Sequence, residues 1–95
     1  MVTSVSPLDL TRDLLAFNTM NPPGQEQECA LYLSTLLESV GFQVHCYEFA
    51  PQRTTVVARL SGVSDRLPLC FTGHIDTVPL HKTCSKLVSR RILVA

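Results

Sequence analysis

The feature that most constrains this chain lies between residues 67 and 79, where an apolar run leads directly into chemically active side chains. Residues 67–71 have the length and composition of a buried strand. Gly73 then removes side-chain bulk, and His74 and Asp76 follow two positions apart before Pro79 ends the segment. Residues i and i+2 of an extended backbone point to the same side. We therefore expect the His74 imidazole and the Asp76 carboxylate to meet.

An imidazole paired with a carboxylate has a known use in metal centres. A histidine that binds a metal through one ring nitrogen commonly donates its other N–H to a carboxylate, which fixes the tautomer and orients the ring. On this interpretation His74 is a metal ligand and Asp76 orients it. The alternative is a solvated loop histidine. The context of strand, glycine, His-x-Asp and a Val-Pro stop favours the metal site.

Two amphipathic helices are predicted upstream of this segment. Ser6 can cap the first helix, which should end at residues 18–20 because the Asn-Pro-Pro-Gly sequence at 21–24 cannot continue it. We interpret residues 21–24 as a connector, with a substrate contact as the alternative. The second helix is predicted over residues 25–40, with an apolar stripe that faces the core and Gly41 as its stop.

Three strands are predicted after the helices, over residues 42–49, 54–60 and 67–72. Turns are predicted at 51–53 and at 61–66, where glycine, proline and small polar residues gather. The short connector between the last two strands favours an antiparallel pair. The order helix, helix, strand, strand, strand indicates an α/β fold, with both helices packed on one face of a small sheet.

Composition and charge exclude several classes of protein. The chain of 95 residues allows one small domain, and its eight acidic residues all precede residue 80, whereas residues 81–95 carry four basic residues and no acid. This basic tail has no aromatic residue for stacking on bases, so a nucleic-acid partner is not favoured. The sequence shows no signal peptide pattern, no membrane span and no Cys-x-x-Cys spacing, which predicts a cytoplasmic protein with reduced thiols and no membrane partner.

The residues described so far resemble a known family. Residues 73–79, Gly-His-Ile-Asp-Thr-Val-Pro, are similar to the first metal-binding motif of the dizinc amidohydrolases and peptidases. This family includes acetylornithine deacetylase, succinyl-diaminopimelate desuccinylase, aminoacylases and glutamate carboxypeptidases. The resemblance covers residues 6–80, including the Asn-Pro-Pro-Gly loop and the amphipathic helix after it. It implies that His74 binds zinc and that Asp76 is the active-site aspartate beside it.

The resemblance also implies a fold and a reaction. Residues 1–80 would be the N-terminal segment of a mixed-sheet zinc-hydrolase catalytic domain, and residues 81–95 a non-homologous basic tail. The implied reaction is metal-dependent hydrolysis of linear amide bonds in a small N-acyl amino acid or peptide, with zinc as the metal and cobalt as the alternative ion. Members of the family are several times longer and carry a dimerisation domain that has no counterpart here. We therefore expect a truncated, inactive fragment.

Two alternatives stay open from the sequence. The first is a small non-catalytic interaction module that reuses the helix and strand half of such a fold. The second concerns further metal ligands, for which His45, and the pair His81 and Cys84, are candidates. His45 is not favoured because it lies on the more polar face of its predicted strand with no acid in register.

Overall fold

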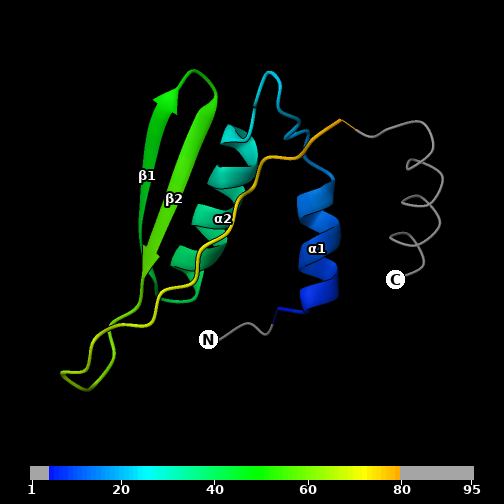
Figure 1. The fold of residues 1–95 in the computed structure, drawn as a ribbon. Helices are drawn as coiled ribbons and strands as arrows, with labels where there is room; N and C mark the ends of the chain where they lie inside the picture. Colours follow the sequence, from blue (N-terminus) through cyan, green and yellow to red (C-terminus); the bar gives the residue numbers. More distant parts are fainter. Residues whose placement is uncertain (1–4, 80–95) are drawn as a thin grey trace.

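The computed structural model describes residues 5–79, which form two helices followed by one β-hairpin (Figure 1). The elements are α1 (Pro7–Leu15), α2 (Gln27–Ser39), β1 (Gln43–Ala50) and β2 (Arg53–Arg59). This part of the chain is an α/β structure, as predicted. The predicted basic tail at 81–95 lies outside the described residues, and the division at residue 80 stays a prediction.

Helix α1 begins where its sequence predicts and ends earlier. Ser6 is the N-cap and accepts a long hydrogen bond of 3.5 Å from the N–H of Asp9, with proline in the first turn. The helix ends at Leu15, before the predicted 18–20. The amides of Ala16 and Phe17 donate to carbonyls three residues back, which tightens the last turn and ends the helix.

Helix α2 confirms the predicted amphipathic helix over 25–40 and its glycine stop. Gly41 has φ of +101°, in the left-handed region that glycine adopts without a steric penalty. The Phe42 N–H donates to the Leu37 carbonyl at 3.0 Å, and the Gly41 N–H to the Glu38 carbonyl at 3.1 Å. This pair of bonds is a Schellman motif, which satisfies carbonyls at the helix end and turns the chain into β1.

Strands β1 and β2 form an antiparallel hairpin that one helix covers. Val44 pairs with Ala58 and Cys46 with Val56, and the two strands join through a turn at residues 51–52, as predicted. Helix α2 packs against both strands. The fully buried apolar residues of the described chain are Cys29 and Ala30 of α2, so the hydrophobic core is small.

The predicted third strand over 67–72 is wrong for this structure. The segment runs alone after β2 (yellow in Figure 1) and joins no sheet. Its Leu67, Leu69 and Phe71 side chains are 94%, 81% and 88% exposed. The antiparallel pair is β1 with β2, not the last two predicted strands. An apolar run of this kind needs neighbours on both faces to become a strand, and residues 5–79 supply none.

The packing of α1 also differs from the prediction. Among the described elements only α2 packs extensively on the hairpin, whereas α1 stands apart from it (Figure 1). Side chains join the α1 region to α2: the Tyr32 hydroxyl donates to Asp13 at 2.7 Å, and the Phe17 and Tyr32 ring centroids lie 5.5 Å apart. Neither helix within residues 5–79 is long and apolar enough to cross a membrane.

The small core predicts the cost of adding volume to α2. Ala30 has no exposed surface, so Ala30→Leu must displace its neighbours and should lower the free energy of unfolding by about 1–3 kcal/mol. Thr35→Leu on the exposed side of the same helix is the matched control and should change it by less than about 0.5 kcal/mol. Urea unfolding followed by circular dichroism measures both, and equal stabilities would contradict the packing described.

Candidate functional site

The candidate site is held together where the end of the extended segment meets the loop before α2. The Asn21 N–H donates to the Thr77 carbonyl at 2.8 Å, and the Thr77 N–H donates to the Thr19 carbonyl at 2.9 Å. The hydroxyls of Thr19 and Thr77 lie 3.3 Å apart, and Thr19 is buried. These contacts fix the backbone next to residues 74–76 against a loop more than fifty residues earlier in the chain.

His74 and Asp76 meet as the sequence predicts. The His74 Nδ1 lies 2.9 Å from the Asp76 carbonyl oxygen and 3.1 Å from the Asp76 Oδ1. Both oxygens accept and neither donates at neutral pH, so Nδ1 carries the ring proton. The neutral ring then keeps a lone pair on Nε2. Because the His74 side chain is 85% exposed, this nitrogen is accessible to a ligand.

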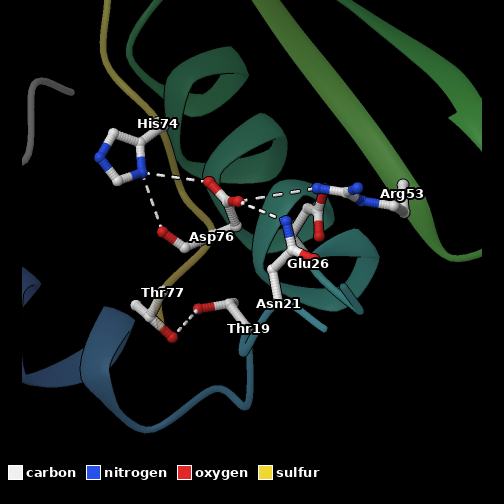
Figure 2. A network of polar contacts seen from close by, with 7 residues as sticks. All are labelled: Thr19, Asn21, Glu26, Arg53, His74, Asp76 and Thr77. Carbon is white, nitrogen blue, oxygen red and sulfur yellow. Dashed lines mark hydrogen bonds and ion pairs between the residues drawn. The ribbon is translucent and has the colours of Figure 1, made fainter. Parts of the chain in front are cut away.

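The second oxygen of Asp76 has partners of its own, which Figure 2 shows. The Asn21 side-chain amide donates to Asp76 Oδ2 at 3.1 Å, and Nη2 of Arg53 lies 3.7 Å from the same oxygen. The Asn21 hydrogen bond is the main cause that holds the pKa of Asp76 below its ordinary value. The hydrogen bond and charge of His74 and the charge of Arg53 act in the same direction, against partial desolvation.

Arg53 is itself held by a buried carboxylate. Its Nε donates to Glu26 Oε1 at 3.0 Å, and Glu26 is 5% exposed, with Oε2 buried and without a hydrogen-bond partner among the described residues. The guanidinium lies over the Phe49 ring, 5.1 Å from its centroid. Gly24 leaves room for it, because a Cβ at that position would lie 2.6 Å from the Arg53 Nε. Carboxylate, ring and glycine thus fix the arginine side chain.

These polar groups face a groove of about 1070 Å³. His74, Asp76 and Arg53 line one part of it, and apolar side chains from α1, α2, β2 and the extended segment line the rest, among them Leu14, Cys29 and Val56. Small-molecule sites in proteins commonly have this character, an apolar lining with a few convergent polar groups. The His74 ring, whose Nε2 is the candidate metal ligand, and the Arg53 guanidinium thus lie beside an apolar surface.

The described residues fit one ligand of a metal centre and not a complete set. Within residues 5–79, no three histidine, cysteine, aspartate or glutamate side chains come close enough to hold a metal ion. His45 lies on the exposed face of β1 near Tyr47, with ring centroids 6.3 Å apart, and does not line the groove. His81 and Cys84 lie outside the described residues. The roles of His74 as ligand and Asp76 as active-site aspartate stay predictions.

Three residues of this site were not identified from the sequence. Asn21 was assigned to a connector, although a substrate contact was left as the alternative. Glu26 falls in the helix predicted over 25–40 and Arg53 in the turn predicted at 51–53, and neither prediction marks them as residues of a site. The sequence feature that points to these contacts is Gly24, a glycine between a proline pair and a helix, because a residue without a side chain permits close approach of another group. In the structure Gly24 has φ of +82°.

Comparison with known proteins gives one distant similarity. No family model matches the chain, and no solved structure matches it. The chain is 29% identical over 76 residues to succinyl-diaminopimelate desuccinylase of Ehrlichia ruminantium, in both the Gardel and the Welgevonden strains. The aligned part is 78% of this chain and 19% of the relative, so the chain spans about a fifth of the length of these relatives. The similarity supports, at a distance, the resemblance of residues 73–79 to a family that includes such desuccinylases.

Gly24 provides a test of the site's packing. Gly24→Ala places a Cβ against the fixed Arg53 side chain and forces alanine into the left-handed region, so we expect the free energy of unfolding to fall by about 1–3 kcal/mol. Gly62→Ala is the control, because its Cβ meets nothing within 4 Å. Thermal unfolding compares the two variants, and a Gly24→Ala protein as stable as Gly62→Ala would refute the close approach of Arg53.

The contacts of Asp76 predict a dependence on pH. Since its pKa is lowered in the folded chain, Asp76 stabilises the fold above the pKa of the unfolded chain, and this contribution is lost as the pH falls through the folded value. Carboxyl carbon NMR should give Asp76 a lower pKa in the folded chain than in the same chain in denaturant. Equal values in the two states would show that the Asn21 and His74 contacts do not persist in solution.

Proposed function

We propose that this chain contributes the His74 and Asp76 part of the active site of a metal-dependent hydrolase of linear amide bonds. The observation that carries the proposal is the contact of the His74 Nδ1 with two oxygens of Asp76, which leaves Nε2 of an exposed ring beside a groove. Metal-binding histidines are commonly oriented in this way. The distant similarity to a desuccinylase supports the same class of reaction.

Each residue then has a defined part. His74 would bind zinc, or cobalt as the alternative, through Nε2, and Asp76 would hold the ring in the tautomer that keeps this nitrogen free. When bound, such an ion polarises a carbonyl and activates water at neutral pH. Asp76 is negatively charged at that pH, as an ordinary aspartate is, and its contacts with Asn21 and His74 lower its pKa further. A charged carboxylate makes the imidazole a more basic ligand.

The substrate class is proposed from the chemistry of the groove. It offers apolar surface beside the His74 ring, which suits the acyl part of a small molecule. The relatives are named as desuccinylases of a succinylated diamino acid. We therefore propose N-acyl amino acids as the substrate class. The free thiols of Cys29, Cys46 and Cys70 are compatible with the proposed cytoplasmic location.

Turnover is proposed to need ligands that residues 5–79 do not bring together. A catalytic zinc site uses about three protein ligands and one open position. The described residues gather no such set, and only His74 has the expected orientation. We therefore propose that this chain alone binds metal weakly and hydrolyses no amide substrate.

A second candidate function, an interaction module without catalysis, is favoured by one observation. Leu67, Leu69 and Phe71 stand almost fully exposed on a segment that joins no sheet. Exposed apolar side chains of this kind commonly mark a surface that another chain covers. The two candidates differ in their dependence on His74, because only the hydrolase needs its imidazole.

Zinc titration of the 95-residue chain tests the first candidate. We expect weak binding that His74→Ala abolishes and His45→Ala leaves unchanged, since of these two histidines His74 is the one whose Nδ1 a carboxylate holds. Competition with a chromophoric chelator measures the affinity. Binding that survives His74→Ala would reject the assignment and leave the interaction module as the better candidate.

Hydrolysis assays complete this test. N-succinyl-diaminopimelate and N-acetylornithine serve as substrates, and no turnover is expected from the purified chain. Hydrolysis that stops on chelation, returns with zinc and disappears in Asp76→Ala would show that the chain is a working enzyme and that the single-ligand interpretation is wrong.

A further inference from the structure

We propose that Asn21 is a positioning residue that pins the Asp76 carboxylate so that one of its oxygens faces the His74 ring. This inference rests on the proposed function of His74 and Asp76 and adds a residue to it. Asn21 belongs to the loop before α2, and its amide reaches Asp76 across a separation of 55 residues in the sequence. It acts through Asp76 and does not touch His74 in the structure.

The backbone places the Asn21 amide with little freedom. The N–H of Asn21 donates to the Thr77 carbonyl, and the N–H of Thr77 donates to the Thr19 carbonyl, at 2.8 and 2.9 Å. Thr77 directly follows Asp76 in the chain. Asn21 and Asp76 are therefore held on two backbone segments that are already joined one residue away, and the Asn21 side chain needs only its own rotamer to reach the carboxylate.

The two carboxylate oxygens of Asp76 contact different partners, as Figure 2 shows. Oδ2 accepts from the Asn21 amide at 3.1 Å, and Oδ1 lies 3.1 Å from the His74 Nδ1. A carboxylate is rigid and planar, so a donor fixed on one oxygen also fixes the direction of the other. Without Asn21, the Asp76 side chain is free to rotate and carry Oδ1 away from the ring, which leaves the Asp76 carbonyl oxygen at 2.9 Å as the remaining acceptor for Nδ1.

Arg53 supports the same oxygen from further away. Its Nη2 lies 3.7 Å from Asp76 Oδ2, beyond hydrogen-bond length, and its Nε is bound to Glu26 at 3.0 Å. The guanidinium thus supplies positive charge near Oδ2, whereas the directed contact comes from Asn21. This difference makes Asn21 the residue whose removal should release Asp76.

The metal-free chain allows a direct test with NMR of the histidine ring nitrogens. In the native chain the proton should lie mainly on Nδ1 of His74. In Asn21→Leu, which has a similar volume and no donor, the share of this tautomer should fall below the native value but stay above that of His45, the exposed reference in the same spectrum, because the Asp76 carbonyl oxygen still accepts from Nδ1. Zinc affinity of the same variant should fall about tenfold, the lower end of the loss seen when groups that orient a ligand are removed.

Asn18→Leu is the matched control, because Asn18 lies in the same loop and accepts from the Met20 N–H without contacting Asp76. It should leave the tautomer share and the zinc affinity unchanged. Circular dichroism checks that each variant is folded. If Asn21→Leu does not fold, Asn21→Ser, whose hydroxyl is too short to reach Asp76, takes its place in both measurements.

The outcomes separate this inference from the proposed function. An unchanged His74 tautomer in the folded Asn21 variant, or an equal change in Asn18→Leu, would overturn the positioning role. If the tautomer changes in the Asn21 variant alone, the positioning role stands. Should zinc binding then prove independent of His74, the proposed metal role falls and the positioning role does not.

Discussion

The buried ion pair between Glu26 and Arg53 is the interaction on which the rest of the described structure depends. Glu26 stands at the start of α2 and Arg53 at the start of β2, and Arg53 also approaches Asp76. The pair therefore joins helix, hairpin and extended segment at one point. Removing Arg53 would leave the Glu26 carboxylate buried without compensation, a loss that commonly costs about 3–5 kcal/mol. Gly24 and the Phe49 ring complete the enclosure of the guanidinium.

Features that depend on short-range chemistry could be predicted from the sequence. The cap at Ser6, the stop at Gly41 and the turn at residues 51–52 follow from the conformational preferences of a few adjacent residues, and the structure contains all three. The contact between His74 and Asp76 could also be predicted from local sequence, because side chains two residues apart in an extended backbone point to the same side. Helix α2 was predictable because its apolar period extends over thirteen residues.

Features that depend on distant segments could not be predicted in this way. The apolar run at 67–72 has the composition of a strand, but a strand also has to pair with a sheet edge, and this run pairs with neither edge of the β1–β2 hairpin. The contact of Asn21 with Asp76 joins residues 55 positions apart, and nothing in either local sequence indicates it. Arg53 falls in a predicted turn, and the local sequence does not indicate its ion pair, because its partner Glu26 lies 27 residues earlier, before α2.

The long sequence separation within the site has a consequence for the order in which it assembles. The hairpin closes through a two-residue turn, whereas the site requires that residues 19–21 meet residues 76–77. Closing a longer loop costs more conformational entropy, and contacts of this kind form late in folding. The segment that carries His74 is held by its contacts at Asp76 and Thr77 and joins no sheet, so we expect it to open more readily than the hairpin. Within residues 5–79, the chemistry thus lies on a segment that we expect to dock after the hairpin has formed.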